Sequence, residues 1–468
     1  MRRRFFAKSK NIDINNYFTI EALEDNFVVK LSFNTIKYCI NGDGKWYSLS
    51  ADTDTVNINR GETLSLKGNL TPNSNNGIGK FTILKKCNIK GNLMSLLYGD
   101  NFEGKIDLSE KPYAFYGLFS ECNIINASEL ILPALTLSES CYRDMFYNCF
   151  SLRTPPPLIA DILTEYCYNW MFYGCSSLTT APQLLATTLA SNCYNNMFYN
   201  CTSLTTVSDL PATILCDYCY DSMFKGCTAL VNAPKLHGEV LGVGCYIDMF
   251  KGCTSLTNAP QLLVENLTEY CYYGMFQGCT ALVNAPDLPS TTLSPYCYQN
   301  MFQGCTALTK APDLPSENLT NYCYHSMFYG CTTLTKAPKL PAKKLSAYCY
   351  YYMFRGCTNL TEAPELPATT LANYCYAYMF ELCNKMQVSP ILSAPTLVTR
   401  CYQYMFRNCS SLNKITMLAT NTNASYCLYN WVNGVASSGT FIKHKDATSL
   451  SNGVSGIPNG WTTQDYTD

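Results

Sequence analysis

Residues 293–316 read LSPYCYQNMFQGCTALTKAPDLPS, and the same pattern returns every 26 residues along most of the chain. The first cysteine of the pattern recurs without a slip from Cys141 to Cys427, and a second series follows eight residues behind, from Cys149 to Cys409. A fixed period of this length is typical of proteins in which each repeat forms one coil and the coils stack. We therefore expect a solenoid that grows by addition, rather than 468 residues divided among several globular domains.

The first half of each repeat predicts a short helix. Apolar residues return there every four positions, which is the spacing of neighbours on one helix face. Ser294 suits an N-cap and Gly304 a left-handed C-terminal cap, so a helix of two to three turns is expected between them. Leu382 takes the place of this glycine in one coil, where we expect local strain. The side chains expected to face the core are Leu293, Cys297, Tyr298, Met301 and Phe302.

The second half of each repeat predicts an extended segment. Leu308 and Leu314 are expected to point inward, after Cys305. Pro312 removes one ladder donor, so the strand should be short or irregular. The fold class predicted is an α/β repeat solenoid, leucine-rich-repeat-like, of about twelve coils with one short strand and one short helix in each.

The remaining segments differ from the repeat. Residues 27–33 have strand composition, and Asn41-Gly42-Asp43-Gly44 is a turn signal, so a small antiparallel β domain is expected near the N-terminus. The predicted organisation is a basic and polar arm at 1–16, a sandwich-like β domain at 17–86, an N-terminal cap of the solenoid at 87–113, the solenoid at 114–426 and a C-terminal cap at 427–468.

Composition narrows the classes of partner. The formal net charge is −1, which gives no electrostatic reason to expect nucleic acid or an anionic membrane as a partner. No run of 18 apolar residues is present to span a bilayer. Arg2-Arg3-Arg4 resembles the start of a twin-arginine signal, but polar residues follow it instead of an apolar stretch. We therefore expect folding in a reducing cytoplasm.

The repeated cysteines allow three interpretations. Metal binding needs clustered ligands, whereas the spacing here is eight and the three histidines are out of register. Disulfides between coils require a close approach and an oxidising compartment. The interpretation we favour is a ladder of buried free thiols that fill space as small apolar groups. The residues assigned a structural role are Cys141, Cys149, Cys297, Cys305, Met301, Phe302, Gly304, Leu308 and Leu314. No metal or cofactor is expected.

The tyrosines also allow more than one interpretation. Tyrosine follows the first cysteine in almost every coil, and a residue repeated so regularly is more simply a structural aromatic ladder with hydroxyls at its rim than a set of sugar-stacking platforms. Recognition is better assigned to the positions that vary between coils, although a merely solvated face is an open alternative. The candidate binding residues are Trp170, Asn196, Tyr273, Gln299, Tyr351, Tyr352 and Tyr404. On the extended side, Lys336 and Lys339 should pair with Glu362 and Glu365 of the next coil and fix the register.

The repeat resembles a known family. The motif MF-x-G-C-T-x-L-T, followed by a proline-ended extended segment, is similar to the BspA-like leucine-rich repeats of bacterial surface proteins. The fuller form, YCYxxMFxGCTSLTxAPxLPATTL, resembles repeats encoded by gut Bacteroides and their bacteriophages. The opening at 18–25, residues 68–72 and the ending at 455–461 also look like that group. The resemblance implies adhesion at a cell surface or virion, and it carries over no catalytic residue.

These observations favour a non-enzymatic recognition protein. We expect a phage virion component of the tail-fibre or receptor-binding type, made in the host cytoplasm, that binds host surface polysaccharide or surface protein. A bacterial cell-surface adhesin and a purely structural spacer are the alternatives. The N-terminal region is expected to hold an anchor partner in the virion or at the cell surface, and a homo-oligomer is compatible with the sequence.

Overall fold

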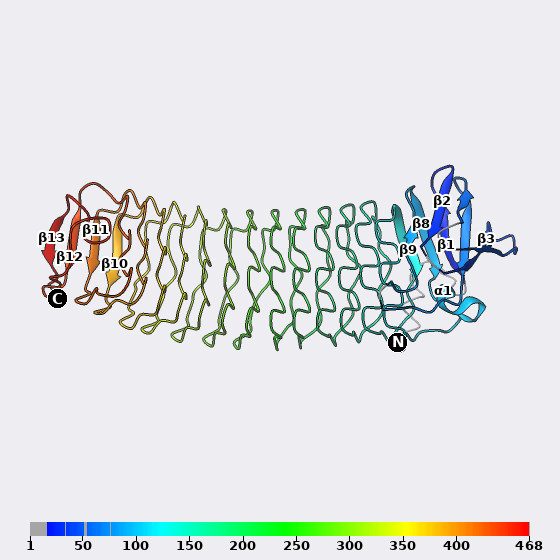
Figure 1. Ribbon diagram of the computed structural model, residues 1–468, viewed down its shortest axis with the longest axis horizontal. Helices are drawn as coiled ribbons and strands as arrows, with labels where there is room; N and C mark the ends of the chain where they lie inside the picture. The colour runs from blue at the N-terminus through cyan, green and yellow to red at the C-terminus, as the bar shows by residue number, and fades with distance from the viewer. Residues whose placement is uncertain (1–15, 33, 51–53, 75, 468) are drawn as a thin grey trace. The chain divides into compact units, whose positions relative to one another are not determined.

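The computed structural model describes residues 16–32, 34–50, 54–74 and 76–467. The arm expected at 1–16 lies almost wholly outside these residues. The chain divides into two compact units, the first formed by residues 1–230 with 234–237 and the second by 231–233 with 238–468. Figure 1 labels helix α1 (Ser95–Tyr98) and most of the strands of these units. Each unit contains stacked repeats.

The first unit opens with two sheets. Strand β2 shows why they form: its residues are alternately buried and exposed, as a strand covered on one face requires. One sheet has the order β4-β3-β6-β1-β8-β9 and the other β5-β2-β7. The strands are β1 (Phe18–Ala22), β2 (Phe27–Leu31), β3 (Ile36–Ile40), β4 (Tyr47–Leu49), β5 (Val56–Ile58), β6 (Thr63–Lys67), β7 (Phe81–Thr82), β8 (Cys87–Asn92) and β9 (Ile124–Ile131).

The larger sheet continues beyond residue 86, where the sequence placed a boundary. Its pairings are antiparallel up to β1–β8, but β9 pairs with β8 in parallel. The helix α1 (Ser95–Tyr98) and the 3-10 turn η2 (Gly99–Asn101) follow β8. The Ser95 hydroxyl accepts a bond from the Phe18 amide at 3.0 Å and donates to the Leu66 carbonyl at 2.9 Å, which holds α1 against the sheet. The sheet therefore continues into the first repeat through β9.

The prediction of a short helix in each repeat is wrong. In the quoted coil the amide of Cys297 donates to the Ser294 carbonyl at 3.3 Å and that of Met301 to the Tyr298 carbonyl at 3.2 Å, bonds that close four-residue β-turns. Every second amide points instead to the next coil, as that of Tyr298 does to the Cys323 carbonyl at 3.1 Å. Among residues 76–467 the only helical segments are α1 and η2, so the α/β class is corrected to a strand-and-turn repeat.

A four-residue period explains the error. The chain in this segment turns two side chains inward and the next two outward, so the inward pairs recur every four residues as they would on a helix. The distinguishing feature is the backbone: Tyr296, Asn300 and Gly304 all have positive φ, at 61°, 59° and 73°. A left-handed residue at every fourth position is incompatible with a right-handed helix and is what successive type II turns require. Gly304 has the backbone conformation expected of it, but in a turn and not in a helix cap.

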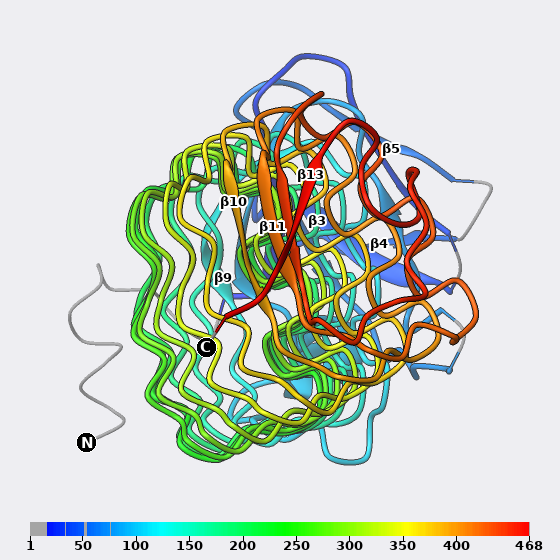
Figure 2. The ribbon, with the colours of Figure 1, turned by 90° about the vertical axis from the view of Figure 1, so that its left-hand side faces the viewer.

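The extended half of each repeat forms little regular strand. Within the second unit, parallel contacts there are single bridges, such as Asn284 with Lys310 and Thr292 with Asn318. In the second unit the longer strands lie near its end, where β10 (Val388–Leu392), β11 (Lys414–Met417), β12 (Thr440–Lys443) and β13 (Thr462–Asp465) make a parallel sheet in that order (Figure 2). The expectation of short or irregular strands, based on the recurring proline, is confirmed.

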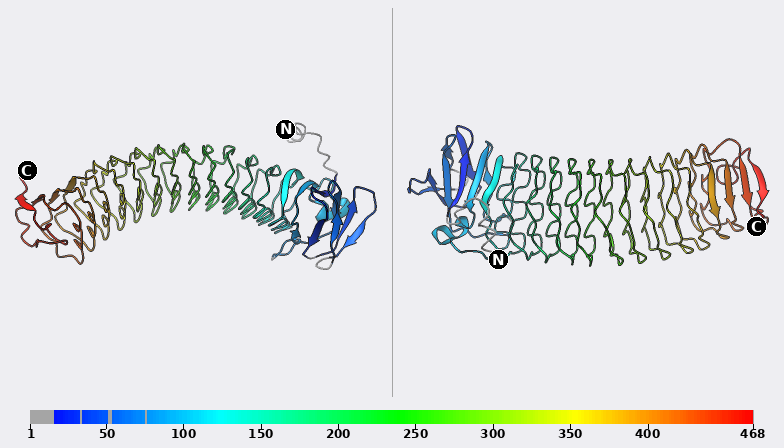
Figure 3. Two further views of the ribbon diagram at one scale, coloured as in Figure 1. Left: turned by 90° about the horizontal axis from the view of Figure 1, so that it is seen from above. Right: turned by 180° about the vertical axis from the view of Figure 1, so that it is seen from behind.

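The core of both units is a set of stacked columns. The inward tyrosines of the second unit, from Tyr272 to Tyr350, stack at ring separations of 5.8–5.9 Å, and the phenylalanines from Phe276 to Phe354 at 5.6–5.7 Å. Trp431 then covers both columns, with ring centroids 6.4 Å from Tyr402 and 5.8 Å from Phe406. Figure 3 shows the coils of each unit lying side by side.

The second cysteine of the repeat does more than fill space, because its thiol makes a hydrogen bond. The thiol of Cys305 donates to the carbonyl of Phe276 at 3.1 Å, and the second cysteines of neighbouring coils in the second unit repeat this bond. All 27 cysteines are free, and all except the half-buried Cys216 are buried. The eight apolar residues assigned a structural role are also buried. Each is fully or almost fully removed from water, which is worth about 1.5–3 kcal/mol for a side chain such as Met301 or Phe302.

Candidate recognition surface

The outward pairs of the turn segments form a surface that we call the turn face. In the quoted coil it consists of Gln299 with Asn300 and Gln303 with Gly304, together with Tyr296. All seven candidate binding residues lie on this face and are partly exposed. Trp170, Asn196, Tyr352 and Tyr404 hold its left-handed position, at φ values of 55–58°. The candidates do not form one site: Trp170 and Asn196 belong to the first unit and the other five to the second.

Three of the candidates meet in a single cluster of the second unit. Tyr351 and Tyr352 contact each other edge to face, with ring centroids 4.2 Å apart. Tyr352 also packs against Tyr378 at 4.6 Å, and Tyr378 stacks on Tyr404 at 4.7 Å. We call Tyr351, Tyr352, Tyr378 and Tyr404 the aromatic cluster. The sequence did not single out Tyr378, although it stands at the same repeat position as Tyr352 and Tyr404.

Two arginines border the aromatic cluster. Arg355 and Arg407 both form ion pairs with Glu381, whose carboxylate is almost fully buried between them. The Arg355 guanidinium also lies 5.1 Å from the Tyr352 ring, and that of Arg407 lies 4.5 Å from the Tyr404 ring. Since two cations share one carboxylate, the border of the cluster carries a net positive charge. Cation–π contacts of this kind hold the tyrosine rings in place.

A second row of tyrosines was missed by reasoning from the sequence. Tyr270, Tyr296, Tyr322, Tyr348 and Tyr374 stand one residue before the first cysteine of successive coils, and each ring stacks on the next at 4.5–4.7 Å. Their recurrence before the cysteine was the available signal. Burial raises the pKa of Tyr322 and of Tyr348. Because the ring faces cover one another, this row presents ring edges and hydroxyls outward, which is unsuited to stacking on sugar rings.

The other candidates lie in polar surroundings. The side-chain amide of Asn300 donates to the Tyr273 hydroxyl at 3.2 Å, and Gln277 donates to Gln303 at 2.7 Å across adjacent coils. Gln299 is partly exposed beside them, and its buried Oε1 atom has no hydrogen-bond partner among the described residues. Asn196 donates to the side-chain oxygen of Asn195. These hydrogen bonds join side chains within a coil or between adjacent coils, so the stacking of the coils accounts for them without a ligand.

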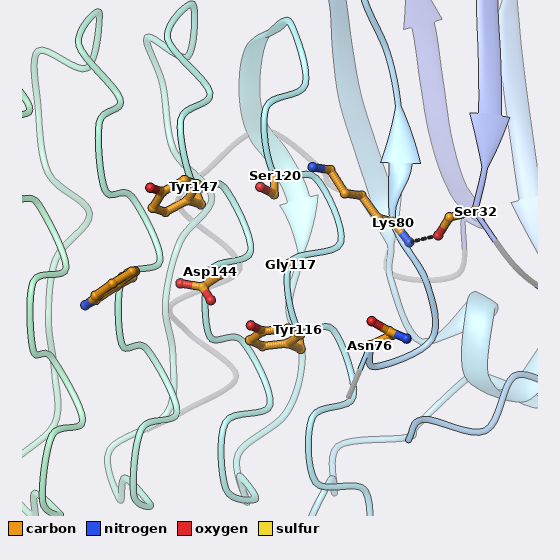
Figure 4. Close-up of a pocket in the computed structure, with 9 residues that line it drawn as sticks. Ser32, Asn76, Lys80, Tyr116, Gly117, Ser120, Asp144 and Tyr147 are labelled. Carbon is orange, nitrogen blue, oxygen red and sulfur yellow. Dashed lines mark hydrogen bonds between the residues drawn. The ribbon is translucent and has the colours of Figure 1, made fainter. Parts of the chain in front are cut away.

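Trp170 has different neighbours. Its ring packs 5.5 Å from that of Tyr173 and 6.0 Å from that of Tyr147. It also lines a hollow of about 360 Å³ that lies within the first unit (Figure 4). This is the candidate residue that the structure places in a concave site.

The tyrosines that follow the first cysteine are structural. From Tyr142 to Tyr402 they are 1–2% exposed, so they offer no surface to a ligand. Their hydroxyls are not at a solvated rim, contrary to the expectation; those of Tyr142 and Tyr272 are buried without a partner among the described residues. On the extended side, Lys336 pairs with Glu362 at 2.8 Å as expected. Both side chains are largely exposed, so the pair contributes about 0–1 kcal/mol.

Within the described part of the chain, no group of three His, Cys, Asp or Glu side chains could hold a metal ion. No helix in residues 16–32, 34–50, 54–74 or 76–467 is long and apolar enough to cross a membrane.

Comparison with known proteins identifies the repeat. A family model described as "BspA type Leucine rich repeat region" matches in six copies, over residues 113–231, 246–361 and 348–433. No curated protein and no solved structure matches the chain. The matched residues span more than half of the sequence and coincide with the stacked coils. The chain belongs to the BspA type leucine-rich repeat family.

Proposed function

We propose that this chain is a non-enzymatic recognition protein that adheres to a surface ligand through the aromatic cluster of its second unit. The observation that carries the proposal is the convergence of four partly exposed tyrosines and two arginines on the turn face. Tyrosine and arginine are enriched among residues that dominate binding energy, because they bring large contact area with a polar end. Family membership supports a recognition role at a surface.

The variation between coils supports this assignment. At the repeat position of Tyr352, Tyr378 and Tyr404, the coils before them carry Gly274, Asn300 and Ser326. Aromatic residues are thus concentrated in three successive coils and are not required for stacking itself. A row needed only for the fold would repeat throughout, as the buried tyrosines do.

The finer proposal concerns the carrier and the ligand. The carrier we favour is a phage virion component of the receptor-binding type, with a bacterial cell-surface adhesin as the alternative. The ligand would be host surface polysaccharide or surface protein, and an anchor partner would bind the N-terminal region. The positive border of the aromatic cluster supports an acidic or phosphorylated surface group in either kind of ligand.

Binding to host cells tests the proposal. Tyr352→Asn and Tyr404→Asn together should weaken binding about tenfold or more, since each aromatic anchor contributes on the order of 1–3 kcal/mol. Asparagine is chosen because it tolerates the left-handed backbone of these positions. Cells treated with periodate or with protease would distinguish a polysaccharide from a protein ligand.

A matched control alters the extended side instead. Lys336, Lys339, Glu362 and Glu365 would all be changed to glutamine, which removes their charges without touching the turn face. Undiminished binding by the tyrosine variant, with loss in the glutamine variant, would move the site to the extended side. Undiminished binding by both would leave the second unit as a spacer.

A further inference from the structure

The hollow of the first unit arises from one missing side chain. Gly117, Asp144 and Trp170 occupy the same position of three successive coils: their amides donate to the carbonyls of Arg143, Asn169 and Asn195, at 2.9, 3.0 and 3.0 Å. All three have positive φ, at 59°, 56° and 56°. A Cβ atom built on Gly117 would meet nothing within 4 Å. The column of side chains therefore stops at Asp144, and a space opens above Gly117.

The walls of this space combine aromatic rings with polar groups. Tyr116, Tyr147 and Trp170 contribute ring surfaces, and Asp144 lies among them (Figure 4). The opposite wall comes from the β sheets and their loops. Its polar side chains, with one from the adjacent coil, are Ser32, Asn76, Lys80 and Ser120. The volume of about 360 Å³ is in the range of sites for small ligands.

The charges in the hollow are balanced by neighbours. The Lys80 ammonium pairs with the Glu121 carboxylate at 2.7 Å, and the Asp144 carboxylate lies 3.7 Å from Arg143. A cationic ligand would meet Lys80 and an anionic one would meet Asp144, so neither sign of charge is favoured. A ligand that both donates and accepts hydrogen bonds suits this wall, because hydroxyl groups can do both.

One costly feature lies in this hollow. The Asp144 side chain is 15% exposed, and its Oδ1 atom is buried without a hydrogen-bond partner among the described residues. Burial raises the pKa of this carboxyl, although the charge of Arg143 and the hydroxyl of Tyr116 oppose the shift. A buried polar atom without a partner costs stability, and a binding role would explain why it is retained.

We propose that the hollow above Gly117 binds one neutral hexopyranose ring of a surface glycan. The apolar face of the sugar would lie against the rings of Trp170 and Tyr147, and its hydroxyls would donate to the carboxylate of Asp144 and accept from Lys80. The site is separate from the aromatic cluster, and it does not depend on the function proposed for that cluster.

Saturation-transfer NMR with methyl glycosides tests the proposal on the full chain. The probes are the methyl glycosides of glucose, galactose, mannose and N-acetylglucosamine, with choline as a cationic comparison. At least one glycoside should give a saturable signal and choline should give none. Failure of all four glycosides to bind, or tighter binding of choline, would overturn the ligand class.

Three substitutions then locate the binding. Gly117→Asn should fill the hollow while keeping the backbone, because asparagine occupies this column at Asn196 and Asn300 with φ of 55° and 59°. Trp170→Asn removes the ring and Asp144→Asn removes the charge. Each should weaken the glycoside about tenfold or more, since each removes a contact worth roughly one factor of ten.

The control is Tyr296→Asn, in the stacked tyrosine row of the second unit, where the equivalent position of another coil carries Asn192 with φ of 57°. It should leave glycoside binding unchanged, because that row presents no ring face to a sugar. Thermal melts would establish that the variants fold. If Gly117→Asn does not fold, Trp170→Asn provides the test of the hollow. Binding by a folded Gly117→Asn or Trp170→Asn variant at the native affinity would contradict the assignment.

Discussion

The amide of Tyr298 donates its hydrogen bond to the carbonyl of Cys323 in the next coil, at 3.1 Å, while the amide of Cys297 beside it turns back to Ser294. The alternation means that every second amide joins coils and every other one closes a turn. Its geometric requirement is a left-handed residue once in every four, and the following predictions depend on that requirement.

Gly304→Val should destabilise the second unit, whereas Gly304→Asn should have little effect. The φ of Gly304 is 73°, and a Cβ there would lie 3.8 Å from Gly278, an ordinary contact. The cost is therefore conformational, roughly 1–2 kcal/mol for a β-branched residue. Urea unfolding followed by circular dichroism would measure it. Equal stability of the two variants would show that the turn does not need a left-handed residue.

Gly174→Asn should cost more than Gly304→Asn, by roughly 1 kcal/mol. Both positions are left-handed, but a Cβ at Gly174 would overlap the side-chain oxygen of Asn148 in the preceding coil. The double variant Asn148→Gly with Gly174→Asn should recover the part of the loss that the Asn148 side chain causes, because it removes the overlapping oxygen. A double variant no more stable than Gly174→Asn would argue against this packing.

Leu382→Asn should stabilise the protein by roughly 0.5–1 kcal/mol. Leu382 has a φ of 66° at the position where other coils carry glycine or asparagine, and the strain expected from the sequence is thus present. The side chain is only partly buried, so little apolar burial is lost on replacement. A lower unfolding midpoint in this variant would mean that its packing outweighs the backbone strain.

Most thiols should be unreactive in the folded protein. Twenty-six of the 27 cysteines are buried and one is half-buried, and burial raises the pKa of thiols such as Cys305, to about 12, and Cys216. Titration with a thiol reagent at pH 8 should therefore label Cys216 first and slowly. In denaturant without reductant nearly all cysteines should react; a denatured count close to zero would establish disulfides instead.

Stability should fall as the pH drops from about 6.5 towards about 4 because of His325. Burial lowers the pKa of this imidazole from 6.5 to about 4, so the folded state keeps it neutral while the unfolded state takes up a proton. A lowered folded pKa gives stability that is present above the unfolded value and lost as the pH falls, on the order of 2–3 kcal/mol here. His325→Gln, which copies Gln299 of the preceding coil, should flatten this part of the profile. An unchanged profile would place the acid sensitivity elsewhere.

From the period of 26 residues alone, the sequence predicted stacked coils, buried columns of equivalent side chains and parallel stacking. Cys297, Met301 and Phe302 could be assigned to the core because they recur in nearly every coil. The local backbone could not be assigned this way, since pairs of inward residues every four positions fit both a helix and a run of turns. The decisive signal was Tyr296, Asn300 and Gly304 together, and only the glycine shows its conformation in its residue type.

The candidate surface was predictable only in part. Variation between coils correctly separated Tyr351, Tyr352 and Tyr404 from the buried tyrosines. It could not show that Tyr378 and two arginines join them, because those contacts cross from coil to coil. The hollow beside Trp170 depends on Lys80 and Asn76, which lie outside the repeats, so no reasoning within the repeat could have found it.

Hydrogen bonds that run from each coil to an equivalent atom in the next have a consequence for how such a gene can change. Within the second unit, loss or duplication of one 26-residue segment would reconnect Tyr272-type donors to Cys297-type acceptors with every bond remade. Unequal recombination between near-identical repeats would therefore yield folded proteins of different lengths. The three coils that carry Tyr352, Tyr378 and Tyr404 differ from their neighbours, so each such event would also change how many coils lie on either side of them. The position of the aromatic cluster along the stack could thus change without any new type of contact between coils.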